Sequence, residues 1–308
     1  METTRALMHG VIDYAGLFPP AQLDMPRTVA AFARHRSGDD RWALGKLVVP
    51  VKRLGEFERC ADGLLPAGER DDSEDPLPLT VLSDATYDES FEDELNAIDR
   101  FNKRHAEPGA GRAIIEMVEI KAKGANMIEG ALELMPESLF PWFELSWQQD
   151  IRGMVAALSE MESGAKVRTG GTTADAHPTP LALARFLAAC HAADVPFKAT
   201  AGLHHPFRHF APGVGCEQFG FVNVFVGGAL LHHGTVEQEE LEMLLADGER
   251  RNFEFTPTSV SWKGRTLSLG QLREAREKFA TTFGSCSFDE PMDDLRSLNL
   301  LPPVAAKA

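Results

Sequence analysis

The chain has 308 residues, of which 44% are hydrophobic, and its formal net charge at pH 7 is -15. This length and apolar content suffice to bury a large core, in one large α/β domain or two smaller ones. The acidic balance argues against nucleic acid or an anionic membrane as partner, because binding to either requires clustered positive charge.

Apolar, β-branched runs alternate with segments of helical periodicity along the whole chain, and their order predicts eight strand-helix units. The expected strands are 10–14, 44–51, 77–84, 113–121, 139–146, 165–170, 197–203 and 281–287. The expected helices lie within 26–36, 54–64, 91–104, 127–135, 151–158, 183–190, 219–233 and 292–298.

The eighth strand has two candidates, 253–262 and 281–287. The first is followed by Lys263-Gly264 and another short β-like run, which is typical of a hairpin. The second precedes Asp289-Glu290-Pro291 and an apolar helical stripe, a strong helix start. We therefore assign 281–287 to the last strand and expect a β-hairpin inserted at 250–268, which either covers the barrel mouth or mediates dimerisation.

Eight such units predict an α/β fold, a (β/α)₈ TIM barrel that occupies 1–308 as one domain, with reactive groups at the C-terminal ends of its strands. A doubly wound open sheet is the alternative. No Gly-x-Gly-x-x-Gly follows a strand, and no Gly-x-x-x-x-Gly-Lys occurs, so no motif supports nucleotide binding.

Two lysines head similar strand segments, Lys166 in Lys-Val-Arg-Thr-Gly-Gly and Lys198 in Lys-Ala-Thr-Ala-Gly. Their separation of about thirty residues matches one βαβ unit, which places them on adjacent strands. A buried amine beside another cation loses its proton more readily, so the pair indicates a Schiff-base nucleophile. Ordinary strand lysines whose ends reach solvent are the structural alternative.

Two strand-borne carboxylates are candidates for proton transfer. Strict alternation along 113–121 places Glu116 and Glu119 on opposite faces, so only one of them faces the lumen unless the strand has a bulge, and we expect it to be Glu116. Asp13 lies at the tip of the first strand, where a carboxylate could shuttle protons, cap a helix or form an ion pair. Crowding of two lysines and Arg168 around one carboxylate would keep at least one amine neutral.

Small residues and polar groups follow the last strands, where free backbone N–H groups bind phosphate or carboxylate. The substrate-binding residues predicted here are Arg168, Gly170, Gly171, Thr200, Gly202, His204, His205, Ser285 and Ser287.

Five motifs resemble, in the same chain order, the strand motifs of deoxyribose-phosphate aldolase: Ile12-Asp13-Tyr14, Glu116-Met117-Val118, Lys166-Val-Arg-Thr-Gly170, Lys198-Ala-Thr-Ala-Gly202 and Phe283-Gly284-Ser285-Cys-Ser287. The resemblance implies a class I aldolase barrel in which Lys166 forms the Schiff base and Lys198 tunes its pKa. It implies that Glu116 replaces a proton-relaying aspartate supported by Asp13, and that Gly202, Ser285 and Ser287 line a phosphate pocket.

The chain departs from that pattern at Arg168, which replaces a small polar residue, and at Leu203-His204-His205-Pro206 after the seventh strand. Over nearly its whole length it also resembles bacterial proteins of no assigned function that carry Asp-Tyr-Ala-Gly-Leu-Phe-Pro-Pro and Ala-Gly-Leu-His-His-Pro. That second resemblance implies no activity.

The favoured hypothesis is a Schiff-base lyase or aldolase acting on a small anionic or phosphorylated carbonyl compound, without cofactor or metal. One alternative is a metal-dependent hydrolase or lyase that uses His204, His205 and His209. The other is a barrel that binds a ligand without catalysis. Scattered cysteines, with no Cys-x-x-Cys pair, predict a cytoplasmic protein, and the absence of a long apolar stretch predicts no membrane span. The sequence leaves open whether the protein is a homo-oligomer.

Overall fold

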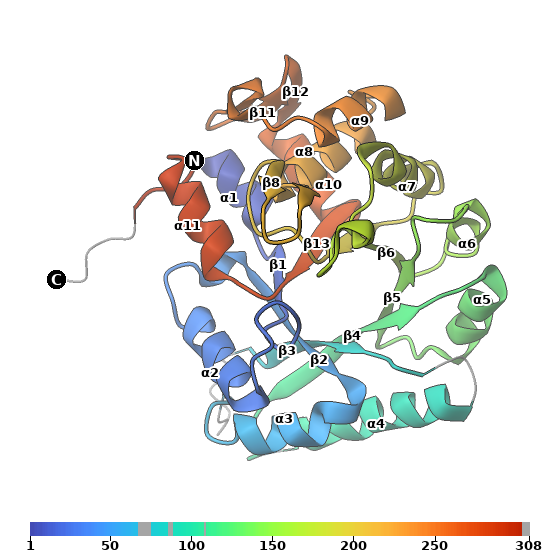
Figure 1. The fold of residues 1–308 in the computed structure, drawn as a ribbon. Helices are drawn as coiled ribbons and strands as arrows, with labels where there is room; N and C mark the ends of the chain where they lie inside the picture. Colours follow the sequence, from blue (N-terminus) through green and yellow to red (C-terminus); the bar gives the residue numbers. More distant parts are fainter. Residues whose placement is uncertain (67–74, 86–88, 108, 304–308) are drawn as a thin grey trace.

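The computed structural model describes residues 1–66, 75–85, 89–107 and 109–303. Within these ranges the chain forms a closed barrel of parallel strands inside a ring of helices (Figure 1). The predicted (β/α)₈ TIM barrel is therefore confirmed.

Every neighbouring pair of barrel strands is parallel, and the order around the barrel is β1-β13-β7-β6-β5-β4-β3-β2. The segment 280–285 closes the barrel against the first strand, which confirms the choice between the two candidates for the last strand. The barrel strands are β1 (Ile12–Tyr14), β2 (Leu44–Pro50), β3 (Leu77–Leu82), β4 (Ala113–Lys121), β5 (Phe140–Leu145), β6 (Gly164–Arg168), β7 (Phe197–Thr200) and β13 (Ala280–Ser285).

Two of the helices that follow the strands begin at a side-chain cap that the sequence provides. Asp24 accepts a hydrogen bond from the backbone N–H of Arg27, and Thr179 does the same for Ala182, each just before a proline in the first turn. The ring consists of α2 (Met25–Arg36), α3 (Leu54–Ala61), α4 (Glu89–His105), α5 (Ala125–Leu134), α6 (Arg152–Ala156), α7 (Pro180–Ala192), α8 (Phe221–His232) and α11 (Asp289–Ser297).

Helix α8 is apolar all round, and its residues are buried from Phe221 to Leu231. Such a helix needs cover on both sides. The barrel covers one side, and two further helices that the sequence did not predict, α9 (Gln238–Leu245) and α10 (Leu269–Lys278), pack against it. The N-terminal helix α1 (Glu2–Met8) packs against α10.

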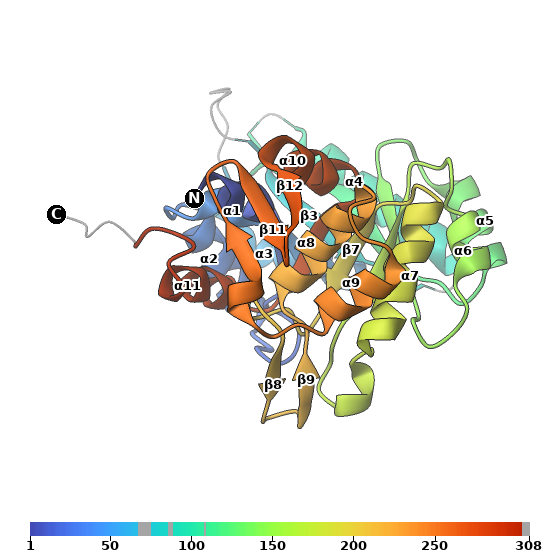
Figure 2. The ribbon, with the colours of Figure 1, turned by 90° about the horizontal axis from the view of Figure 1, so that it is seen from above.

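The expected insertion before the last strand is present, but it is a three-stranded antiparallel sheet rather than a two-stranded hairpin. It consists of β10 (Phe253–Phe255), β11 (Ser259–Trp262) and β12 (Arg265–Ser268). The sheet packs on α8 and α10 at the outside of the helix ring (Figures 1 and 2). It therefore does not cover the barrel mouth.

A second insertion, which the sequence did not predict, follows β7. Strands β8 (His209–Ala211) and β9 (Cys216–Gln218) form a hairpin that projects beyond one end of the barrel (Figure 2). The acidic run 69–75, whose charges and flanking prolines predict a solvated loop, lies outside the described residues except for Asp75. No helix in the described ranges is both long and apolar enough to cross a bilayer.

Candidate functional site

A cavity of about 930 Å³ opens at the C-terminal ends of the barrel strands. Its inner end is formed by strand residues that include Glu119, Lys166 and Arg168, and its outer wall by Phe18 with the β8–β9 hairpin. The C-terminal end is where barrels of this fold carry their reactive groups.

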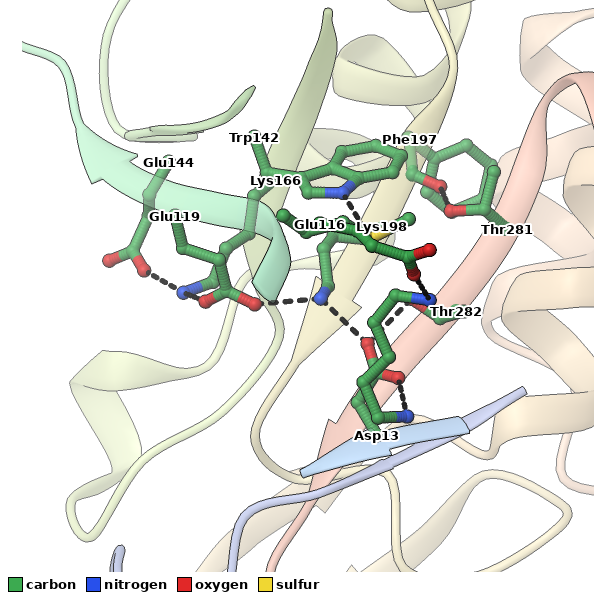
Figure 3. Close-up of polar contacts among 12 residues, drawn as sticks. Asp13, Glu116, Glu119, Trp142, Glu144, Lys166, Phe197, Lys198, Thr281 and Thr282 are labelled. Atoms are coloured by element: carbon green, nitrogen blue, oxygen red, sulfur yellow. Dashed lines mark hydrogen bonds and ion pairs between the residues drawn. The ribbon is translucent and has the colours of Figure 1, made fainter. Parts of the chain in front are cut away.

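Five charged side chains form a continuous chain from the edge of this cavity into the lumen (Figure 3). The Nζ atom of Lys166 lies 2.8 Å from Glu144 Oε2 and 2.5 Å from Glu119 Oε2. Lys198 Nζ continues the chain, 2.7 Å from Glu119 Oε1 and 2.8 Å from Asp13 Oδ2. Glu119 thus bridges the two lysines.

The strand register brings these groups together. Lys166 of β6 is the Cα partner of Lys198 on β7, and Glu144 of β5 is the partner of Lys166. Paired residues of neighbouring strands point to the same side of a sheet, so all three side chains enter the lumen at one level. The predicted adjacency of the two lysines is therefore observed.

Glu116 does not occupy the position that we expected for it. Ile115 pairs with Leu79 and Met117 with the next residue, Thr80, so Glu116 is an extra residue in β4, a bulge. The bulge shifts the alternation by one residue, and Glu119 faces the lumen instead. Glu116 lies 3.2 Å from Lys46 Nζ, with 49% of its side chain exposed, and does not border the cavity.

The charges are balanced once Arg168, which pairs with Glu144, is counted with the five side chains. Three carboxylates (Asp13, Glu119 and Glu144) face three cations (Lys166, Lys198 and Arg168), whereas we expected a single carboxylate among the cations. Ion pairing therefore replaces the mutual repulsion that the sequence suggested.

The pKa shifts have the directions that this pairing demands. Burial disfavours the charged form of Glu119, but the two lysines outweigh it and lower the pKa of Glu119 to about 2. Burial likewise opposes the charge on Lys198, and Asp13 with Glu119 outweighs it and raises the pKa of Lys198. For Glu144 the balance is the same, since burial is outweighed by Lys166 and Arg168, which lower its pKa.

The two lysines differ in their access to the cavity. Lys166 borders the cavity, whereas Lys198 is fully buried and is not part of its wall. Its Nζ atom lies 5.8 Å from the centre of the Trp142 ring, a cation–π distance. Asp13 is also buried, and accepts hydrogen bonds from the Lys46 backbone N–H and the Thr282 hydroxyl. A ligand in the cavity can therefore reach Lys166 but not Lys198.

The structure divides the predicted substrate-binding residues into two groups. Gly170, Ser285 and Ser287 do not border the cavity, because Gly170 packs on Gly202, Ser285 is buried, and the Ser287 hydroxyl accepts a hydrogen bond from the Glu290 backbone N–H. The residues that do border it are Arg168, Gly171, Thr200, Gly202, His204 and His205.

The three histidines considered as metal ligands all border the cavity, at its mouth. His204 Nδ1 lies 3.0 Å from Glu290 Oε2, and His205 Nδ1 lies 2.6 Å from Asp294 Oδ2. The ring centres of His205 and His209 are 4.5 Å apart. Across the described ranges, no three His, Cys, Asp or Glu side chains are grouped as metal ligands would be.

Sequence reasoning missed two residues of the charged chain. Glu119 was assigned to the wrong face because the bulge was not predicted. Glu144 was overlooked, although a lone acid near the end of the apolar strand Phe-Pro-Trp-Phe-Glu-Leu was a usable signal. No family model, curated protein or solved structure matches the chain.

Proposed function

We propose that the barrel is a Schiff-base lyase or aldolase with Lys166 as its nucleophile. The observation that carries the proposal is a lysine at the wall of a deep cavity, held between two carboxylates and linked through one of them to a second, sealed lysine. Proton acceptors next to an amine that a carbonyl compound can reach are what imine formation requires.

In the proposed reaction Lys166 first passes a proton to a neighbouring carboxylate. Glu144 is the more accessible acceptor, because 15% of its side chain is exposed compared with 5% for Glu119. The free amine then adds to the carbonyl carbon and gives a carbinolamine. Protonation of its hydroxyl releases water and leaves a protonated imine on Lys166.

The protonated imine accepts the electron pair of an adjacent C–C bond when that bond breaks, and the reverse step forms the bond. In the cleavage direction a base must remove the proton from the hydroxyl group on the departing carbon, and that carbon then becomes the carbonyl carbon of the released fragment. Glu119 is a carboxylate that borders the cavity, so we assign this step to it. Lys198, which Asp13 holds in place, would stabilise the charge on Glu119 throughout.

Covalent trapping tests the proposal. The wild-type protein and a Lys166→Met variant are incubated with small aldehydes and ketones and then with borohydride, and intact mass is measured. We expect an adduct in the wild type that is absent from Lys166→Met. Lys46→Met is the matched control, because Lys46 also forms an ion pair on a barrel strand but does not border the cavity, and it should keep the adduct.

An adduct of equal yield in Lys166→Met, or none with any carbonyl compound in the panel, would contradict the proposal. Binding of a carbonyl compound without trapping would favour a barrel that holds a ligand without catalysis.

The unpaired cysteines Cys60, Cys190, Cys216 and Cys286 agree with the proposed cytoplasmic location.

A further inference from the structure

Arg168 is a cation on the cavity wall two residues beyond the proposed nucleophile. It ends β6, on the same side of the strand as Lys166 and with its Cα about 7 Å away, because alternate strand residues share a face. Its side chain is 44% exposed, and its Nε atom lies 3.5 Å from Glu144 Oε1, an ion pair longer than a hydrogen bond. No other carboxylate in the described ranges lies within 4 Å of it.

A planar guanidinium with donors to spare is suited to a carboxylate group, which it can hold through two hydrogen bonds. Arg168 therefore offers a second attachment point to a ligand whose carbonyl carbon is at Lys166. Because the two side chains leave the strand two residues apart on the same face, one small ligand can contact both.

The same cavity is poorly suited to a phosphate. Of the three residues that the aldolase resemblance assigns to a phosphate pocket, Ser285 and Ser287 do not border the cavity. The Ser287 hydroxyl instead accepts a hydrogen bond from the Glu290 backbone N–H in the first turn of α11. The Glu290 carboxylate borders the cavity beside His204, with 55% of its side chain exposed, and would repel a group of charge near -2.

The rest of the wall is largely apolar. Phe18 and Pro20 line it from the loop after β1, Leu82 from the end of β3, and Phe210 and Val214 from the β8–β9 hairpin. Phe210 is 56% exposed and presents an apolar ring at the outer wall of the cavity. This wall leaves room for an uncharged, apolar remainder of a ligand.

We infer that the substrate is an unphosphorylated oxo acid whose carboxylate pairs with Arg168 while its carbonyl carbon reaches Lys166 and its apolar remainder faces the hairpin. The inference rests on the proposed Schiff-base function and narrows it to one class of carbonyl compound.

Borohydride trapping rates test the inference with matched probes. The acids are pyruvate, acetoacetate and levulinate, which are 2-, 3- and 4-oxo acids. The uncharged probes are butanone and methyl levulinate, and the phosphorylated probe is dihydroxyacetone phosphate. In the wild type we expect at least one oxo acid to be trapped about tenfold faster or more than every neutral and phosphorylated probe, the ratio that one charge-assisted pair supplies.

The variants assign that preference to Arg168. The ratio of the trapping rate of the oxo acid to that of the uncharged probes should fall to about one in Arg168→Gln. It should be unchanged in Lys46→Met, because Lys46 lies outside the cavity. The inference is overturned if dihydroxyacetone phosphate or a neutral ketone is trapped at least as fast as every oxo acid, or if Arg168→Gln keeps the preference. Those results leave Schiff-base chemistry standing, whereas no trapping of any probe on Lys166 defeats the proposed function itself.

Discussion

Replacing Lys198, which is fully buried, should destabilise the fold far more than replacing Lys166, which borders the cavity. Lys198→Met removes the only side-chain cation that contacts Asp13 in the described structure, and leaves that carboxylate, which is 1% exposed, with the Lys46 backbone N–H and the Thr282 hydroxyl. Removing one partner of a buried ion pair costs about 3–5 kcal/mol, because the other charge stays buried without compensation. We expect a loss of this size in the free energy of unfolding at pH 7.

Lys166→Met leaves no carboxylate without a cation. Glu119 keeps Lys198, and Glu144, which is partly exposed, keeps Arg168. We therefore expect a loss of about 1–2 kcal/mol, in the range of an ordinary point substitution. The difference between the two variants comes from geometry alone, because both replace a lysine by an uncharged side chain of similar length.

The pH dependence has a defined sign. In the wild type the pKa of Glu119 is lowered from 4.5 to about 2, so its contribution to stability is complete above pH 4.5 and is lost as the pH falls toward 2. In Lys198→Met the penalty comes from one buried negative charge without a cation, so it disappears as protons neutralise that charge. The stability gap between the two proteins should therefore narrow as the pH falls from 7 to about 4.

Urea unfolding followed by circular dichroism, at pH 7 and pH 4.5, measures these differences. Lys198→Met/Asp13→Asn is the matched control, since it removes the buried charge of Asp13 along with the lysine. Its free energy of unfolding should exceed that of Lys198→Met by at least about 2 kcal/mol. The reasoning is refuted if the two single lysine variants lose equal stability, or if Asp13→Asn adds to the loss instead of reversing it.

Two further predictions concern single residues. Glu119→Gln should lower the turnover rate about a hundredfold or more, as expected for loss of a proton-transfer group, whereas Glu116→Gln on the same strand should stay within about threefold of wild type. Steady-state kinetics with the trapped substrate measures both rates, and a larger loss in Glu116→Gln would contradict the assignment. Gly202→Ala should lower the free energy of unfolding in urea by about 1–2 kcal/mol, because Gly202 has φ +74° and the new Cβ would lie 3.1 Å from Gly170 Cα. In the control Gly213→Ala no atom lies within 4 Å of the new Cβ, so the free energy of unfolding should change by less than about 0.5 kcal/mol.

The architecture could be predicted because the determinants are local. Alternating strand and helix patterns recur at regular spacing. The start of α7 depends only on two adjacent residues, the N-cap Thr179 and Pro180. The register of Lys166 with Lys198 followed from the same regularity, since matched segments on consecutive strands of a barrel align. The last strand was identified by the helix start that follows it.

The missed features depend on long-range contacts. The bulge at Glu116 exists because Ile115 and Met117 pair with consecutive residues of β3, and pairing with another strand leaves no mark in the sequence of β4 itself. The three-stranded form of the insertion depends on β10, which pairs with β11 across a short connection that we read as one continuous strand. Helices α9 and α10 were missed for a related reason, because they complete the burial of α8 rather than a strand of the barrel.

The finding that Glu119 rather than Glu116 faces the lumen also changes how the proposed nucleophile, Lys166, would be activated. Repulsion between two lysines would leave a neutral amine waiting in the empty site, whereas the observed chain pairs each lysine with two carboxylates. A paired lysine becomes nucleophilic only when a proton moves to a neighbouring carboxylate, and a ligand carboxylate at Arg168 would favour that transfer by drawing Arg168 away from Glu144 and making Glu144 more basic. On this reasoning an oxo acid assists the deprotonation of Lys166, and a neutral ketone of the same shape does not.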